Sequence, residues 1–112
     1  MITIYHNPRC SKSRDTLALL EKIGLKPRVV EYLKTPPSAE ELRSILKLLG
    51  AAPKDIVRKK DAADAGINPD KLTDEKLIAA MVKTPAIIER PIVVAGTKAA
   101  LGRPPENVLK IL

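Results

Sequence analysis

Hydrophobic and polar residues alternate at the start of the chain as in a strand, and then change to the spacing of a helix. Residues 2–5 alternate apolar and polar, which predicts a short strand. Apolar residues then recur at helical spacing over residues 11–23, and Gly24 follows as a stop signal. A second strand is predicted over residues 28–33. Strand, helix and strand in this order form a βαβ unit, so we expect the two strands to run parallel.

The middle of the chain has the pattern of several helices and no strand. Ser38 with Glu41 has the spacing of a capping box, and an apolar stripe follows it. Thr73 precedes two acidic residues in the same way. The predicted elements are a helix from Ser38 to Gly50, a short helix over about 53–57, a polar stretch and loop over 58–72, and a helix from Thr73 to Thr84.

The last part of the chain predicts two more strands and a helix. Residues 91–94 are an apolar run, Ala95-Gly96 is a turn, residues 97–101 can return antiparallel, and 106–112 suit a final helix. The order βαβ, helices, ββα indicates an α/β protein with a thioredoxin-like mixed four-stranded sheet and an inserted helical subdomain. Another α/β sandwich of similar size would also fit the pattern. We expect one domain over 1–112, with its core at about 1–33 and 86–112 and the insertion at about 34–85.

Composition narrows the chemistry of the chain. With 112 residues, the chain is long enough for a core without metal or disulfide staples. One cysteine excludes an internal disulfide, and one histidine excludes a Cys/His zinc cage, so no metal site and no bound cofactor are predicted. There is no membrane-length apolar run and no recognisable signal peptide. We therefore expect a cytoplasmic protein without a membrane partner, present as a monomer.

The net charge of +7 raises the possibility of nucleic-acid binding. Two tyrosines are the only aromatic residues, so few side chains are available to stack on bases. The basic residues are also spread along the whole chain, which suits small anions equally well. We do not expect nucleic acid to be a partner, and a lack of salt-sensitive DNA affinity would exclude it.

Cys10 is the main candidate for chemistry. It lies at a strand-to-helix junction, where unpaired N–H groups and the helix dipole favour a thiolate. Three cations, Arg9, Lys12 and Arg14, lie within four residues of it and would lower its pKa further. A free cysteine is often a small buried core residue instead, but such a basic setting favours a reactive nucleophile.

Other polar residues could assist this thiol. Arg58, Arg90 and Arg103 carry guanidinium groups that can bind a tetrahedral oxyanion through two hydrogen bonds, although any one of them could be a solvated surface charge. His6 could favour the thiolate or be structural at the strand end, and both readings stay open. Ser13 could hydrogen-bond the sulfur from the first helical turn or only assist helix entry.

Five blocks of sequence resemble the glutaredoxin-coupled arsenate reductases, the ArsC family, in the same order and with similar spacing. The blocks are YHNPRCSKSR from Tyr5, YLKTPP from Tyr32, VRKK from Val57, ERPIVV from Glu89 and GRP from Gly102. The resemblance implies a thioredoxin-like fold with a helical insertion and reduction of arsenate to arsenite. In the implied reaction the thiolate attacks arsenic, glutathione resolves the adduct as co-substrate, and glutaredoxin reduces the resulting mixed disulfide.

The resemblance also implies residue roles. Cys10 matches the catalytic nucleophile, and Arg58, Arg90 and Arg103 match the three oxyanion-binding arginines. His6 and Ser13 match residues that tune the thiol. The peptide bond before Pro91 is expected to be cis.

Three other functions remain to be weighed. A Spx-type transcription regulator that binds RNA polymerase shares the fold, but many of these carry a second cysteine where this chain has Ser13. A tyrosine phosphatase needs an arginine six residues after the cysteine, and Thr16 stands there instead. A monothiol thiol–disulfide exchange protein stays possible, since Cys-x-x-Ser supports exchange with an external thiol.

Overall fold

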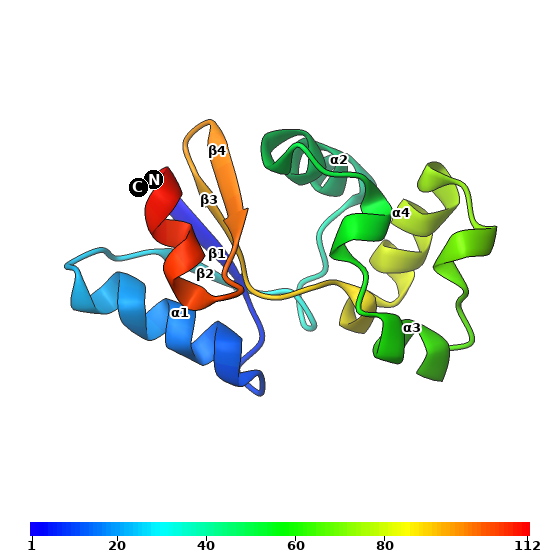
Figure 1. Cartoon of the computed structure of the whole chain (residues 1–112), viewed down its shortest axis with the longest axis horizontal. Helices are drawn as coiled ribbons and strands as arrows, with labels where there is room; N and C mark the ends of the chain where they lie inside the picture. The colour runs from blue at the N-terminus through cyan, green and yellow to red at the C-terminus, as the bar shows by residue number, and fades with distance from the viewer. The chain divides into compact units, whose positions relative to one another are not determined.

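The chain divides into two units, and the first is built from both ends of the sequence. The computed structural model describes all of residues 1–112. The first unit comprises Met1–Thr35 and Arg90–Leu112, and the second comprises Pro36–Glu89. In Figure 1 the first unit therefore carries the colours of both ends of the bar, blue to cyan and orange to red.

A mixed four-stranded sheet forms the first unit. Its strands are β1 (Ile2–His6), β2 (Arg28–Glu31), β3 (Ile92–Ala95) and β4 (Lys98–Leu101), in the order β2-β1-β3-β4. β1 and β2 run parallel, which confirms the predicted βαβ unit, while β3 is antiparallel to both β1 and β4. The α/β class and the thioredoxin-like layout, βαβ followed by ββα with a helical insertion, are confirmed.

One hydrophobic cluster joins the sheet to two helices. The helices are α1 (Ser11–Lys22) and η4 (Pro105–Ile111), the latter of 3-10 type. The cluster consists of Ile4 and Val93 from the sheet, Leu20 from α1, Val108 from η4, and Ala100 from β4. Because Ile4, Val93, Leu20 and Val108 are fully buried, α1 and η4 must cover the same face of the sheet. Replacing such a leucine with alanine typically costs about 2–5 kcal/mol.

Both ends of α1 are fixed by local hydrogen bonds. The helix begins at Cys10, whose backbone is extended at the capping position. At the other end Gly24 adopts φ +87°, a left-handed conformation that glycine takes without steric cost. This allows Gly24 N to donate to Glu21 O at 3.0 Å and Leu25 N to Leu20 O at 3.1 Å. The pair of bonds ends the helix and turns the chain toward β2.

The second unit is helical. Its helices are α2 (Ala39–Leu49), η1 (Pro53–Ile56), α3 (Lys59–Asp64), η2 (Pro69–Lys71), α4 (Asp74–Lys83) and η3 (Pro85–Ile87). Ser38 Oγ accepts from Glu41 N at 3.1 Å and Thr73 Oγ1 accepts from Lys76 N at 3.3 Å, so both predicted caps are present. Leu42 of α2 and Leu77 of α4 are fully buried within this unit.

Three element predictions are wrong in detail. A helix, α3, occupies the start of the region predicted as a polar stretch and loop. Nothing in the sequence indicated this helix, because only Ala62 of its six residues is buried and no apolar period is visible. The final helix is of 3-10 type and begins at Pro105. β2 ends at Glu31, two residues earlier than predicted, because Lys34 N and Thr35 N both donate to Glu31 O and turn the chain.

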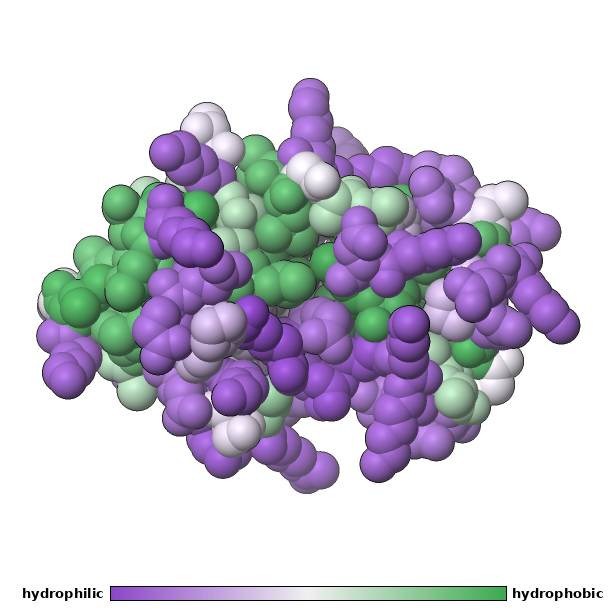
Figure 2. Space-filling view, viewed as in Figure 1, coloured by the Kyte–Doolittle hydropathy of each residue, from purple (hydrophilic) through white to green (hydrophobic).

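Some apolar side chains remain on the surface of the first unit. Ile23, Val29, Leu109 and Leu112 are among the exposed large hydrophobic residues. On the face drawn in Figure 2, hydrophobic colour extends from the loop after α1 across this unit. No helix combines the length and the apolar character needed to cross a membrane.

Candidate active site

One end of the sheet brings four polar residues into a single row. His6 and Glu31 are the paired last residues of β1 and β2, and Asn7 and Tyr32 follow them directly. Arg90 lies two residues before β3, and Arg103 lies two residues after β4. Hydrogen bonds join the Tyr32 hydroxyl to Asn7 and Arg90, and Arg103 Nε to Arg90 O. Gly102 N donates to Pro91 O at 3.0 Å, so pairing does extend beyond the last ladder residues of β3 and β4.

Cys10 stands beside this row, at the start of α1. The turn that leads to it is closed by Cys10 N, which donates to Asn7 O at 3.0 Å. Its carbonyl already accepts the first helical bond, from Arg14 N at 3.0 Å. The side chain is partly exposed, as a nucleophile that must meet a substrate requires. The structure thus places Cys10 at the helix N-terminus that the sequence predicts.

Backbone groups and two arginines act on the sulfur of Cys10. Burial alone would raise the pKa of the thiol. Hydrogen bonds from the Ser13 backbone, the Arg90 side chain and the Lys12 backbone, together with the charge of Arg103, outweigh burial and lower the pKa below its ordinary value. Arg103 Nη2 lies 3.6 Å from Cys10 Sγ. The sulfur is therefore held as a thiolate more readily than a free cysteine.

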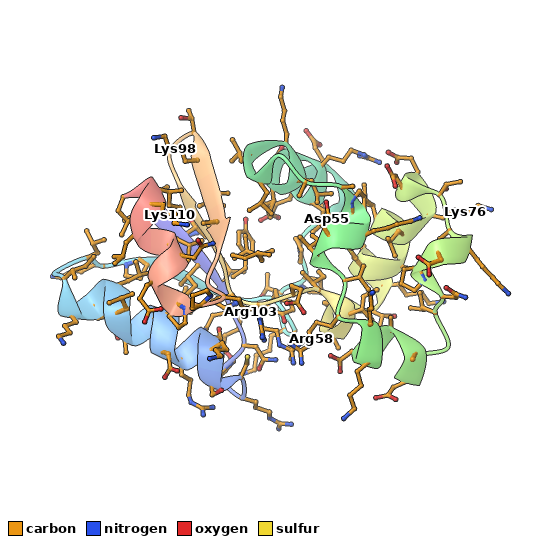
Figure 3. The ribbon with its side chains drawn as sticks, in the orientation of Figure 1. Asp55, Arg58, Lys76, Lys98, Arg103 and Lys110 are labelled. Carbon is orange, nitrogen blue, oxygen red and sulfur yellow. The ribbon has the colours of Figure 1, made fainter.

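Arg90 and Arg103 are also tied to each other. Arg103 Nε donates to Arg90 O at 2.9 Å. Figure 3 shows Arg103 at the end of β4, where the chain turns toward η4. The peptide bonds before Pro91 and Pro104 are both cis: the first is expected from the resemblance, and the second was not anticipated. The two guanidinium groups and the thiol can thus surround a tetrahedral anion from several sides.

Ser13 reaches the thiol through its backbone, whereas its hydroxyl points elsewhere. Ser13 Oγ lies 2.6 Å from His6 Nδ1 and accepts from Asn7 N at 3.0 Å. The sequence left open whether the Ser13 hydroxyl bonds the sulfur. In the structure the backbone N–H of Ser13 makes this hydrogen bond.

His6 is buried, with 6% of its surface exposed. Burial lowers the pKa of its imidazole, with Glu31 opposing and Arg14 reinforcing the effect. A neutral imidazole at physiological pH cannot stabilise the thiolate by charge. The geometry supports a structural contribution from His6, in which the ring holds Ser13 at the first turn of α1.

The cationic side chains that lower the pKa of the Cys10 thiol, Arg90 and Arg103, are far from it in sequence. Arg14 is exposed, and its Nη1 donates to Pro8 O at 2.9 Å, which ties the turn before Cys10 to α1. Neither Arg14 nor Arg9 is among the groups that shift the thiol pKa, and Lys12 acts through its backbone N–H alone. Direct tuning of the thiol by the charges of Arg9, Lys12 and Arg14 therefore stays a prediction.

Arg58 belongs to the second unit. Its Nε lies 2.6 Å from Asp61 Oδ2, and its Nη1 lies 3.7 Å from Glu89 Oε1. These carboxylates orient the guanidinium within its own unit. A role for Arg58 in binding an oxyanion stays a prediction.

Asn7 and Tyr32 were not predicted as site residues, although both lie in the quoted motifs. Tyr32 is 1% exposed and its hydroxyl accepts hydrogen bonds from the side chains of Arg90 and Asn7. Asn7 is 5% exposed and bonds both ends of the turn that carries Cys10. The sequence shows a polar residue after each of the two parallel strands, but it does not show that these residues are buried and bonded to Arg90.

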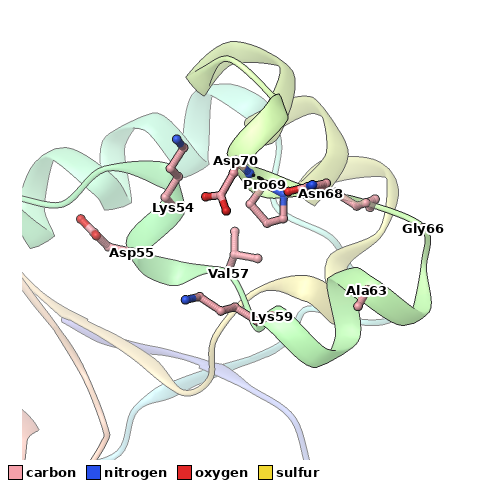
Figure 4. A pocket seen from close by; sticks show the side chains of 10 residues that line it. Lys54, Asp55, Val57, Lys59, Ala63, Gly66, Asn68, Pro69 and Asp70 are labelled. Carbon is pink, nitrogen blue, oxygen red and sulfur yellow. Dashed lines mark hydrogen bonds between the residues drawn. The ribbon is translucent and has the colours of Figure 1, made fainter.

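One cavity lies in the second unit, and Cys10 is not among the residues that line it. It has a volume of about 630 Å³, and Lys54, Val57, Lys59, Asn68 and Asp70 are among its lining residues (Figure 4). Its walls carry both charges and no nucleophile or histidine. This cavity therefore offers no candidate nucleophile, whereas the Cys10 thiol receives hydrogen bonds that lower its pKa. No group of His, Cys, Asp and Glu side chains is arranged to hold a metal ion.

The sheet and the position of the thiol define the class of protein: a thioredoxin-like protein whose one cysteine caps the first helix. The model of the ArsC family matches residues 5–111. The chain belongs to the ArsC family.

Named relatives are similar over nearly the whole chain. The uncharacterized protein YfgD of Escherichia coli K12 is 51% identical, with 99% of this chain and 96% of that protein covered. The arsenate reductase of Haemophilus influenzae is 48% identical, with 99% of this chain and 98% of that protein covered. The solved structure of an arsenate reductase from Vibrio cholerae has a TM-score of 0.93 and is 48% identical, covering 99% of this chain and 97% of that chain.

Proposed function

We propose that this protein is an arsenate reductase in which Cys10 is the nucleophile. The observation that carries the proposal is the environment of the Cys10 sulfur. Arg103 Nη2 lies 3.6 Å from it, the Arg90 side chain donates a hydrogen bond to it, and the pKa of the thiol is lowered. A thiolate beside two guanidinium groups suits attack on a tetrahedral oxyanion. The family and the arsenate reductases among its relatives support arsenate as that anion.

The first step is attack of the Cys10 thiolate on arsenic. A thiolate and an arsenate dianion repel each other, and fixed guanidinium groups reduce that repulsion while orienting arsenic for attack. An oxygen of arsenate leaves as water once it is protonated, and a sulfur–arsenic bond remains. Arg90 and Arg103 are the residues that we assign to anion binding, and the resemblance to the family adds Arg58 as a third candidate.

The second step needs a thiol from outside the chain, because Cys10 is the only cysteine. We propose glutathione. Its sulfur attacks the adduct, a bond forms between the two sulfur atoms, and the electron pair of the sulfur–arsenic bond stays on arsenic. Arsenic is thereby reduced by two electrons and leaves as arsenite, while two thiols are oxidised to one mixed disulfide. Glutaredoxin then reduces this disulfide, and the reducing cytoplasm is the compartment that suits the cycle.

The proposal is tested by arsenate-dependent consumption of NADPH in the presence of glutathione, glutaredoxin and glutathione reductase. The wild type should turn over, Cys10→Ser should not, and Arg90→Ala and Arg103→Ala should each lower kcat/KM by about tenfold or more. Arg43→Ala is the matched control, because Arg43 is exposed and paired with Glu75 at 2.8 Å in the second unit. Wild-type turnover no greater than that of Cys10→Ser contradicts the proposal.

A monothiol exchange protein is the second candidate. The spacing Cys10-x-x-Ser13 supports exchange with an external thiol, and the Cys10 thiol is partly exposed with a lowered pKa. The same enzymes without arsenate, supplied with a glutathione mixed disulfide of a small thiol, separate the two functions. Turnover of the disulfide together with no response to arsenate would favour thiol exchange.

A further inference from the structure

Two buried residues, Asn7 and Tyr32, connect the turn that carries Cys10 to the guanidinium of Arg90. They follow the ends of β1 and β2, which are parallel neighbours, and a hydrogen bond joins the Asn7 side chain to the Tyr32 hydroxyl. Arg90, just before β3, donates to the same hydroxyl. Arg90 donates hydrogen bonds both to the Tyr32 hydroxyl and to the sulfur, so a role of Asn7 and Tyr32 in the site can act through Arg90.

Asn7 uses all of its polar groups. Its N–H donates to Ser13 Oγ at 3.0 Å, and its carbonyl accepts from Cys10 N at 3.0 Å. Its side-chain Oδ1 accepts from Arg9 N at 3.0 Å, and its amide donates to the Tyr32 hydroxyl. The residue thus holds the turn before Cys10 at both ends and joins it to Tyr32. A buried amide with every group paired is costly to replace, since each lost partner leaves an unsatisfied polar atom.

Tyr32 links that turn to the arginine. Its hydroxyl oxygen accepts from Asn7 and from Arg90, and Arg90 also donates to Cys10 Sγ. A guanidinium has a planar fork of donors, so a fixed acceptor on one side determines where its other N–H groups point. With 1% of its surface exposed, Tyr32 has no room to move away from this position. Burial raises the pKa of its hydroxyl, so it stays neutral beside the thiolate.

We propose that Asn7 and Tyr32 are positioning residues, which hold the Arg90 guanidinium in line with the sulfur of Cys10. The chain of contacts runs from the turn, through the Asn7 amide and the Tyr32 hydroxyl, to Arg90 and back to the sulfur. The inference rests on the proposed use of Cys10 as a thiolate, but its test does not need arsenate. A purely structural Tyr32 would affect folding stability and leave the thiol unchanged.

The test measures the rate at which iodoacetamide alkylates the protein as a function of pH. Because Cys10 is the only cysteine, the rate reports on this thiol alone. In Tyr32→Phe the midpoint of the profile should move to higher pH, and the rate below the midpoint should fall about threefold or more. Arg90→Ala should shift the midpoint further. The double variant should match Arg90→Ala, because Tyr32 acts through Arg90.

Controls separate positioning from folding. Tyr5→Phe removes the only other phenol hydroxyl, also from a buried residue, and should leave the midpoint in place. Asn7→Ser keeps a short acceptor for Arg9 N but cannot reach Tyr32, so it should shift the midpoint in the same direction as Tyr32→Phe. Asn107→Ser is its matched control, since Asn107 Nδ2 donates to Leu101 O at 3.0 Å.

Two results overturn the inference. One is a wild-type midpoint in both Tyr32→Phe and Asn7→Ser, whatever their stability in urea. The other is a shift from Tyr32→Phe that is as large in the Arg90→Ala background as in the wild type. If Tyr32→Phe does not fold, Asn7→Ser with Arg90→Ala supplies the same comparison. A shifted midpoint together with no arsenate turnover would support the inference and contradict the proposed function.

Discussion

Replacing Gly102 with alanine tests how tightly the end of the sheet is packed against α1. An added Cβ would lie 2.5 Å from Thr16 Oγ1 and 2.7 Å from Pro91 Cγ. Carbon atoms in ordinary contact are about 3.5–4.0 Å apart, so α1, the proline ring or β4 must move by about 1 Å. Gly102 directly precedes Arg103, and such a shift would also move the guanidinium that contacts the thiol.

The expected loss of stability is about 2 kcal/mol. Overpacking costs about 1–3 kcal/mol. We expect a cost of about 3 kcal/mol at Gly102, because the added Cβ makes short contacts with both a helix residue and a rigid ring. Gly102 does not have a positive φ, so alanine can adopt its backbone conformation. Alanine also lowers the conformational entropy of the unfolded chain, which offsets about 0.4–1 kcal/mol of the lost stability. For a chain of this size the net loss lowers the melting temperature by about 10 °C.

Thermal unfolding followed by circular dichroism measures this loss, and alkylation of Cys10 across pH measures the effect on Arg103. Gly96→Ala is the matched control: Gly96 has φ +61° and open space around it, so its cost comes from the backbone alone. Adding Thr16→Ala to Gly102→Ala removes one of the two clashes and should recover part of the stability.

Two results would refute this reasoning. One is a melting temperature of Gly102→Ala equal to that of the wild type. The other is an alkylation profile that Gly96→Ala shifts as much as Gly102→Ala does, since the effect would then come from general loosening and not from Arg103.

Three further predictions concern protonation and the turn before α1. The alkylation midpoint of wild-type Cys10 should lie below that of a free cysteine, because its pKa is lowered, and Arg103→Ala should raise it; a midpoint at or above the free value contradicts the site. His6 has a lowered pKa, so the unfolded chain binds its proton more tightly. Its contribution to stability is therefore present above about pH 6.5 and lost as pH falls toward the folded pKa. Urea unfolding should accordingly show a smaller loss between pH 7 and 5 in His6→Asn, and an unchanged pH slope would exclude this. Arg14→Ala removes the hydrogen bond to Pro8 O and should lower the free energy of unfolding by no more than about 1 kcal/mol. It should leave the alkylation profile unchanged, and a shifted profile would show that Arg14 does act on the thiol.

The sheet could be predicted because β1 and α1 carry apolar residues at strand and helix spacing and β3 is a continuous apolar run. Ile4 and Leu20 lie in the cluster that the alternation of β1 and the spacing of α1 indicate. α3 was missed because six residues with one buried alanine carry no period. The boundary of β2 was missed because a turn of backbone hydrogen bonds to Glu31 ends it, and apolar Leu33 follows.

The site was predictable in part. Cys10 could be found because its position before a helix is a local property of the sequence. Tyr32 and Asn7 could not, because their proximity to Arg90 depends on the strand order β2-β1-β3-β4, which joins residues far apart in the chain. Arg9 and Arg14 are close to Cys10 in sequence, but the charges that lower the pKa of its thiol come from residues far along the chain, Arg90 and Arg103.

The row formed by Asn7, Tyr32, Arg90 and Arg103 has a consequence for how this chain can vary in length. Each of the four residues follows or precedes a different strand, so the row depends on strand register and hardly at all on loop length. Residues inserted at the Gly96 turn or within the second unit leave the register intact. One residue inserted within β4 would bring a neighbour of Arg103 into the row and turn the arginine to the opposite face. Length changes in this family should therefore concentrate in the loops and the second unit, with the strands near the row keeping constant length.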